Sequence, residues 1–181
     1  MKLLETEIPG VVLLEARVFS DPRGFFFESW NEKTFRRLGI DAHFVQDNHS
    51  HSLAGTLRGL HYQIERPQGK LVRVVRGAVF DVAVDLRRSS PTFGRWTGHE
   101  LSADNRRSLW VPPGCAHGFY ALSEVDFLYK CSAFYDAGDE RTVRWDDADL
   151  AIDWPIDNTR PVKVSVRDQA GVPLADAETY P

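Results

Sequence analysis

The amino-acid sequence predicts a mainly β protein, built as an antiparallel sandwich or barrel. Short strand-like segments follow one another along the chain, and turn residues separate them, with 13 Gly and 10 Pro among 181 residues. Only one segment has the pattern of a helix, whereas a β/α fold would need a helix between successive strands. A jelly roll of about eight strands suits this length. Because the chain has no internal repeat, low-complexity segment or flexible linker, residues 1–181 are predicted to form one domain.

The predicted strands follow from apolar runs and from alternating side chains. They cover residues 71–75, 78–86, 109–111 and 127–135. In the second of these strands, Asp81 and Asp85 fall on the face opposite to Phe80. The third strand runs directly into Pro112-Pro113-Gly114, which is a turn sequence.

The one predicted helix covers residues 31–38. Asn31 is a suitable N-cap, and Gly39 suits the position that follows a helix C-cap. Phe35 and Leu38 are three residues apart, as on one side of a helix. One or a few short helices are therefore expected beside the strands.

Charge and composition narrow the function classes. The chain has 22 Lys and Arg against 26 Asp and Glu, a formal net charge of −4. A general nucleic-acid binder would show a basic excess, so no nucleic-acid partner is expected. Only 5 of the 22 basic residues are Lys. Because the pKa of a Lys shifts readily on burial, each of these five is a candidate for a special role.

The N-terminus and the cysteines indicate a reducing, cytoplasmic location. The apolar run at residues 11–14 is too short for a signal peptide. No window approaches the ~20 apolar residues of a membrane span, so no membrane partner is expected. Cys115 and Cys131 form no C-x-x-C pattern, and two cysteines make no disulfide framework.

Two histidines, each near glycines in the sequence, are the first candidate site residues. His61 is able to act as a general base near neutral pH, although a lone strand histidine is more often structural. Arg58 would face away from His61 in a regular strand, unless a bulge at Gly59 turns both to the same side. His117 is bracketed by two Pro and two Gly, so a rigid backbone is expected to fix its position.

A lysine and two tyrosines give the next candidates. Lys70 stands at the mouth of the strand 71–75, either as a solvated cation or as a cation aimed at an oxyanion. Tyr129 and Tyr135 fall on one face of the strand 127–135. One phenol is a candidate proton donor, and aromatic core filling is the alternative. The candidates for binding a diphosphate anion are Arg23, Arg58, Arg73, Arg76 and Lys163.

These segments belong to a series of short motifs spread over nearly the whole chain. In order, the motifs are Phe19-Ser-Asp-Pro-Arg-Gly-Phe-Phe-Phe-Glu28, Gln46-Asp-Asn48, Leu57-Arg-Gly-Leu-His61, Gly69-Lys-Leu-Val-Arg-Val74, Val79-Phe-Asp-Val-Ala-Val-Asp85, Ser90-Pro-Thr-Phe-Gly94, Ala116-His-Gly-Phe119, Tyr129-Lys130, Tyr135, Asp153-Trp-Pro155 and Val164-Ser-Val-Arg-Asp168. Each motif alone is weak, but together their order and spacing are highly specific. The sequence resembles the dTDP-4-dehydrorhamnose 3,5-epimerase family.

The resemblance implies a cupin-type jelly roll (a double-stranded β-helix), a homodimer, and no cofactor or metal. It implies that dTDP-4-dehydro-6-deoxy-D-glucose is epimerised at C3 and C5 to dTDP-4-dehydro-L-rhamnose, in dTDP-L-rhamnose or related deoxysugar biosynthesis. By position, His61 matches the family's base and Asp168 its partner. Lys70 matches the oxyanion stabiliser, and Tyr129 the acid.

The substrate-binding residues implied by position are Arg23, Phe26, Glu28, Gln46, Asn48, Arg58, His117 and Tyr135. Lys163 is added as a candidate phosphate contact. In the family, Arg23 and Glu28 reach across the dimer into the partner's site. Three positions depart from the family pattern, namely Ala78, Cys115 and Tyr62, and the first two are expected to affect the pocket if they line it.

The chemistry is consistent with these residue types. The hydrogens at C3 and C5 of the sugar are both α to the C4 ketone, so removal of either gives an enolate. Inversion needs a base on one face and an acid on the other. The enolate oxygen needs a cation or a donor. No redox step is required, which agrees with the absence of a glycine-rich dinucleotide motif from the sequence.

Three alternatives stay open. The first is an epimerase that acts only at C3 or only at C5 of a related dTDP-4-keto-6-deoxy sugar in secondary-metabolite biosynthesis. The second is a cupin that binds sugars without catalysis. The third is a metal-dependent cupin, which often carries His-x-His, a Glu and a distant His. Here the spacing reads His61-Tyr62-Gln63, and Gln is a poor ligand for Zn or Fe(II). The close pair His49 and His51 has no Glu in the next several residues, so no metal is expected.

Overall fold

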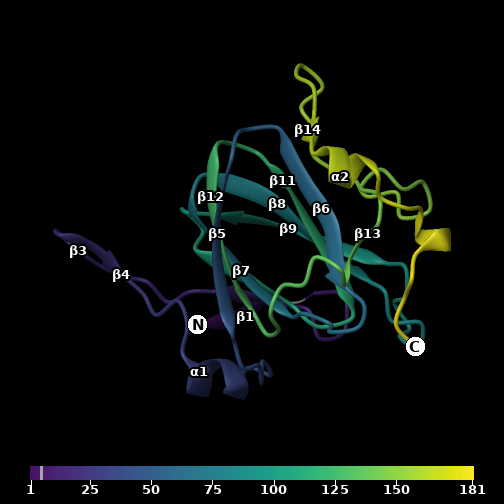
Figure 1. Ribbon diagram of the computed structural model, residues 1–181. Helices are drawn as coiled ribbons and strands as arrows, with labels where there is room; N and C mark the ends of the chain where they lie inside the picture. The colour runs from purple at the N-terminus through teal and green to yellow at the C-terminus, as the bar shows by residue number, and fades with distance from the viewer. Residues whose placement is uncertain (5) are drawn as a thin grey trace.

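Eight strands of the computed structural model, which describes residues 1–4 and 6–181, form a jelly roll of two facing antiparallel sheets (Figure 1). The strands are β5 (Gln46–Ser52), β6 (Thr56–Gln63), β7 (Lys70–Arg76), β8 (Ala78–Asp85), β9 (Trp96–Ser102), β10 (Arg107–Val111), β11 (Cys115–Ala121) and β12 (Val125–Cys131). One sheet has the order β10-β7-β12-β5, and the other has the order β6-β11-β8-β9. The predicted mainly β fold is confirmed.

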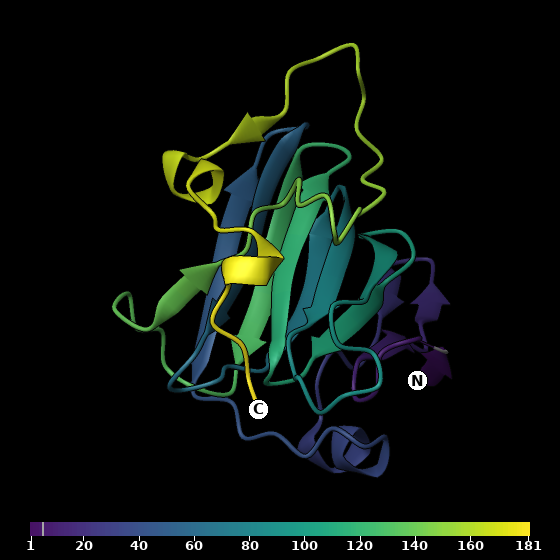
Figure 2. The same ribbon diagram turned by 90° about the vertical axis from the view of Figure 1, so that its right-hand side faces the viewer.

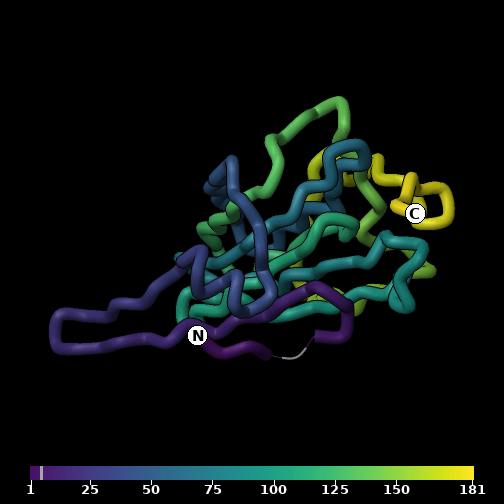
Figure 3. The backbone as a smooth tube through the Cα atoms, turned by 90° about the horizontal axis from the view of Figure 1, so that it is seen from below, coloured from purple at the N-terminus to yellow at the C-terminus, as the bar shows by residue number. Residues whose placement is uncertain are grey.

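Shorter elements extend and cover the two sheets. β1 (Lys2–Leu4) and β2 (Val12–Glu15) add to the first sheet beside β10, while β13 (Glu140–Thr142) and β14 (Lys163–Val164) pair with β6. The hairpin of β3 (Phe19–Asp21) and β4 (Gly24–Phe26) projects away from the barrel (Figure 3). Two short helices, α1 (Glu32–Arg37) and α2 (Val166–Gln169), and the 3₁₀ turn η1 (Leu174–Asp176) complete the fold.

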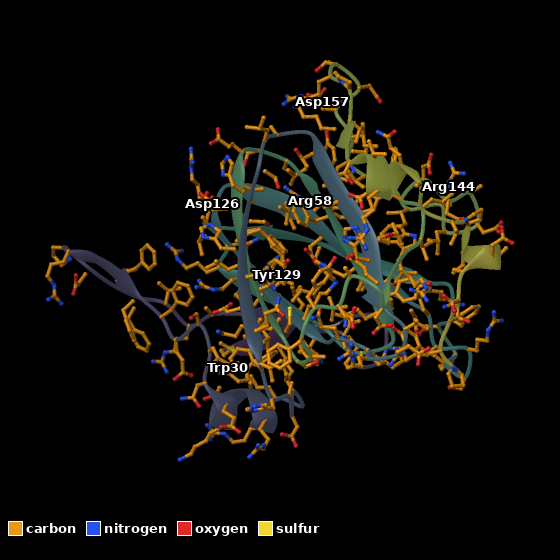
Figure 4. The ribbon with its side chains drawn as sticks, in the orientation of Figure 1. Trp30, Arg58, Asp126, Tyr129, Arg144 and Asp157 are labelled. Atoms are coloured by element: carbon orange, nitrogen blue, oxygen red, sulfur yellow. The ribbon has the colours of Figure 1, made fainter. Side chains whose placement is uncertain are left out.

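The predicted helix begins where its cap indicates. The Asn31 side chain accepts a hydrogen bond from the backbone N–H of Thr34 at 3.1 Å, and Gly39 has a φ of +88°. Phe35 is fully buried against Leu14 and Trp110 on the outer face of the first sheet. Trp30, labelled in Figure 4, packs on Phe35 with ring centroids 4.5 Å apart.

The two faces of β8 follow the predicted alternation. Val79 and Ala83 point into the core between the sheets, whereas Val82 and Val84 point outward. The chain after β13 crosses this outer face (Figure 2), and there Trp154 covers the apolar side chains. Burial between the sheets and under the C-terminal segment therefore uses both faces of the strand.

One strand prediction is wrong at its end. β12 stops at Cys131, so residues 132–135 lie outside the ladder. The backbone N–H of Ser132 donates to Gly69 O, and beyond Ser132 glutamine side chains form hydrogen bonds with the backbone.

Within residues 1–4 and 6–181, every helix is too short or too polar to cross a membrane.

Candidate active site

A cavity of about 320 Å³ opens between the two sheets and collects most of the predicted site residues. The predicted residues that line it are Gln46, Asn48, Arg58, His61, Lys70, His117, Tyr129 and Tyr135. β6 and β11 supply one wall, and β5, β7 and β12 supply the other. Arg58 and Tyr129 are labelled in Figure 4, where both lie within the barrel.

A bulge in β6 brings Arg58 and His61 to the same wall. His61 pairs with His117 of β11, and Arg58 pairs with Phe119, so β6 contains one extra residue between the two pairs. Gly59 lies there with a φ of +121°, and a Cβ on it would come within 2.6 Å of Gly118 Cα. Only glycine suits this backbone and this close approach. The bulge foreseen at Gly59 is confirmed.

His61 is held by a buried carboxylate. Its Nε2 lies 2.5 Å from Asp168 Oδ1 on α2. The N-cap of that helix, Ser165, accepts a hydrogen bond from the Asp168 backbone N–H at 3.1 Å. Burial acts to raise the pKa of Asp168, but the hydrogen bond and charge of His61 outweigh it, so the pKa lies below its ordinary value. Asp168 therefore stays ionised and fixes the orientation of the imidazole.

Lys70 and Tyr129 lie on the wall opposite to His61. Lys70 is the first residue of β7, and Tyr129 lies in the neighbouring strand β12. Burial lowers the pKa of Lys70 and raises the pKa of Tyr129. In the described part of the chain, neither polar head has a hydrogen-bond partner. Both groups are therefore available to a molecule bound in the cavity.

A second histidine–carboxylate pair lies in the wall that carries His61. His117 Nε2 is 3.0 Å from both carboxylate oxygens of Asp81, and both side chains are buried. This contact crosses from β11 to β8 and fixes the position expected for His117. The sequence pattern placed Asp81 on the face of its strand opposite to Phe80 but gave it no role.

The Tyr135 hydroxyl is bound by two residues that the sequence analysis did not select. It donates to Glu140 Oε2 at 3.0 Å and accepts from Arg167 Nη1 at 3.1 Å. Arg167 also forms an ion pair with Glu140. Arg167 precedes Asp168 in a motif that the resemblance covers, so its position in the sequence was the available signal. Glu140 lies outside all of these motifs, so the sequence offered no signal for it.

Four predicted binding residues lie away from the cavity. Arg23 is on the tip of the projecting hairpin with its side chain 90% exposed, and it pairs with Asp21. Phe26 is 70% exposed on the same hairpin. Glu28 follows the hairpin and accepts a hydrogen bond from Asn31. Lys163 donates a hydrogen bond to the backbone carbonyl of Ala54.

The three departures from the family pattern have different surroundings. Ala78 and Cys115 are absent from the residues that line this cavity. Tyr62 lines it, but its hydroxyl donates to the backbone carbonyl of Glu178 at 2.6 Å. No cluster of three or more His, Cys, Asp or Glu suited to a metal ion occurs among residues 1–4 and 6–181.

The fold and the cavity together define a jelly-roll protein equipped for acid–base chemistry, with a histidine–carboxylate pair facing a lysine and a tyrosine. The sequence model of one family, described as dTDP-4-dehydrorhamnose 3,5-epimerase, matches residues 5–176. The chain belongs to this family of sugar epimerases.

Individual relatives cover the chain almost completely. A dTDP-4-dehydrorhamnose 3,5-epimerase from Pseudomonas aeruginosa is 54% identical, with 100% of both chains covered. The structure of dTDP-6-deoxy-D-glucose-3,5-epimerase from Legionella pneumophila, in complex with dTDP-4-keto-L-rhamnose, has a TM-score of 0.94 and 47% identity, covering 98% of this chain and 94% of that one. A 3'-monoepimerase from Streptomyces bikiniensis, in complex with dTDP-quinovose, has a TM-score of 0.87 and 36% identity, covering 94% and 86%.

Proposed function

We propose that the chain converts dTDP-4-dehydro-6-deoxy-D-glucose to dTDP-4-dehydro-L-rhamnose by inverting C3 and C5. The observation that carries this proposal is the placement of His61 and Tyr129 on opposite sheets, with the cavity between them. Inversion of a carbon needs a proton removed from one face and returned to the other. The 3,5-epimerase names of the more similar relatives support action at both carbons.

Each proposed step uses one of these groups. His61 removes the proton α to the C4 ketone, and the ionised Asp168 stabilises the imidazolium that forms. The negative charge moves to the C4 oxygen, where the Lys70 ammonium stabilises it. Tyr129 then donates its hydroxyl proton to the opposite face of the carbon. His61 then loses its proton to solvent and Tyr129 regains one, and repetition at the second α carbon gives the doubly inverted sugar. These steps need no redox cofactor and no metal.

The substrate's remaining contacts are assigned to the cavity and to a partner subunit. Gln46, Asn48, Arg58, His117 and Tyr135 are proposed to hold the nucleotide and the sugar from within the cavity. We propose a homodimer in which the hairpin brings Arg23, Phe26 and Glu28 to the partner's cavity. The exposure of Phe19, Phe25 and Phe26, at 53%, 59% and 70%, supports a partner for this hairpin. Lys163 stays a proposed phosphate contact.

The remaining expectations stay part of the proposal. Residues 1–181 act as one catalytic domain, in the cytoplasm. The test of function is incubation of the purified chain with dTDP-4-dehydro-6-deoxy-D-glucose, followed by NMR of the product. Coupling constants of the L-rhamno configuration support the proposal, and a product inverted at a single carbon overturns it in favour of a monoepimerase.

A further inference from the structure

Three of the four glutamines in the sequence line the cavity, and all three bind the backbone of one segment, residues 132–136. We call this stretch the Tyr135 segment. Gln46 accepts a hydrogen bond from the Tyr135 backbone N–H at 2.9 Å. Gln68 donates to the backbone carbonyl of Ala133 at 2.6 Å.

Gln63 makes the most extensive of these contacts, because it uses both ends of its amide. Its Oε1 accepts from the Asp136 backbone N–H at 3.0 Å. Its Nε2 donates to the carbonyls of Phe134 at 3.2 Å and Arg66 at 3.1 Å. Gln63 is 3% exposed, so its amide is satisfied by these backbone groups and not by water. A carboxylate of the same shape is unable to supply the two donors.

Contacts other than those of the glutamines hold the two ends of the Tyr135 segment, where Ser132 binds Gly69 and Asp136 forms an ion pair with Arg66. The segment lies beyond the end of β12, and the side chains of Phe134 and Tyr135 are 65% and 48% exposed. Little apolar burial therefore fixes the residues between these ends, and the backbone of residues 133–135 depends on the glutamine contacts. The ring of Tyr135 lines the cavity. A shift of this backbone would therefore also move the ring of Tyr135.

Gln63 also stands two residues after His61, where a metal-dependent cupin carries its second His. In this chain that position holds an amide that binds backbone instead. We propose that Gln63 is a positioning residue for nucleotide-sugar binding, acting by fixing the Tyr135 segment against the cavity. The ligand class rests on the proposed function, but the action on the segment does not.

The first test is made without ligand. Hydrogen exchange of the backbone amides at residues 133–136 is compared between the wild type and Gln63→Met, which conserves volume and removes the hydrogen bonds. Faster exchange, confined to this segment while the strands β5–β12 stay protected, is the expected result. Unchanged exchange overturns the proposal whatever the ligand proves to be.

The second test measures dTDP affinity by calorimetry in Gln63→Glu. At pH ~8.5 the carboxylate lacks donors and faces two carbonyls, so we expect about tenfold weaker binding than the wild type. At pH ~5.5 the buried carboxyl is protonated and restores one of the two donors, so part of the affinity relative to the wild type at that pH returns. Gln63→Met should lose affinity at both pH values. The matched control is Gln169→Glu, at an exposed glutamine, which should bind as the wild type does.

A double substitution tests whether the effect passes through Tyr135. In a Tyr135→Ala background, Gln63→Glu should cause little further loss of dTDP affinity. Additive losses, or equal losses for Gln63→Glu at both pH values, contradict the positioning role. If the wild type itself fails to bind dTDP, the proposed function fails, and the exchange measurement still decides the role of Gln63.

Discussion

His61 on β6 and Asp168 on α2 are separated by 107 positions in the sequence, yet His61 Nε2 lies 2.5 Å from Asp168 Oδ1. The contact ties the C-terminal part of the chain to the wall of the cavity. It also leaves the other ring nitrogen of His61 as the one able to accept a substrate proton. The proposed base is therefore held by a carboxylate that is itself 4% exposed.

Replacing this carboxylate should reduce turnover without unfolding the protein. Asp168→Asn keeps the shape but allows the wrong tautomer of His61, so kcat should fall by about 10²- to 10⁴-fold. The control is Asp146→Asn, which removes an exposed carboxylate paired with Arg144. Steady-state kinetics check both variants, and a wild-type kcat for Asp168→Asn would remove Asp168 from the mechanism.

Replacing the base should separate binding from chemistry. His61→Asn should abolish turnover and hydrogen exchange at C3 and C5, while dTDP affinity stays close to that of the wild type. NMR in deuterated water and calorimetry measure the two properties. His43→Asn, at an exposed histidine, serves as the control. Continued exchange in His61→Asn would assign the base to another group.

Removing the proposed acid should leave proton removal intact. Tyr129→Phe keeps the ring that packs near Phe127, with centroids 6.0 Å apart, and deletes the hydroxyl. We expect deuterium to enter the substrate from the His61 side, with inversion lost by about 10²-fold or more. Mass spectrometry and NMR distinguish label from inversion. Inversion at the wild-type rate would contradict the role of Tyr129.

Lys70 should set the alkaline limit of activity. Burial lowers its pKa from the ordinary 10.5, so the cation is present below that lowered pKa and is lost as pH rises through it. Burial raises the pKa of Tyr129, so its hydroxyl stays protonated to a higher pH than usual. Lys70→Arg should move the alkaline limb of kcat/KM upward, and Lys70→Met should cost about 10²- to 10³-fold. An unmoved limb in Lys70→Arg would contradict this assignment.

Asp85 should make the fold sensitive to acid. Burial opposes its ionisation, but hydrogen bonds from Arg87, Ser90 and Thr92 outweigh burial and lower its pKa to about 2. Because this pKa is depressed, ionised Asp85 contributes about 2 kcal/mol of stability above pH ~4. That contribution is lost as pH falls toward the folded-state pKa. Urea unfolding of Asp85→Asn from pH 7 to 3 should show a flatter dependence than the wild type. An identical dependence would refute the contribution.

Much of the fold was predictable because local patterns agree with it. The alternation in 78–86 and the Asn31 cap each depend on neighbouring residues, and both elements form as expected. The end of β12 was not predictable in this way. Residues 132–135 continue the alternating pattern, but side chains of Gln46, Gln63 and Gln68, which lie far away in sequence, bind their backbone.

The same distinction between local pattern and distant partner applies to the site residues. His61 and Lys70 were recognisable because their chemistry is unusual in strands, and Gly59 indicated the bulge. Asp81, Glu140 and Arg167 were missed as site residues, because each acts through a partner that the fold brings near. No residue pattern in a single chain places Arg23, on a hairpin that points away from its own cavity, or Glu28, which follows that hairpin.

In the proposed reaction, opposite walls of the cavity remove and return protons at two carbons. The most direct measurement is the reaction of dTDP-4-dehydro-6-deoxy-D-glucose in deuterated water, with the deuterium content of C3 and C5 determined by NMR. We expect deuterium at both carbons of a product inverted at both. Deuterium at one carbon alone, with the other centre unchanged, would contradict it.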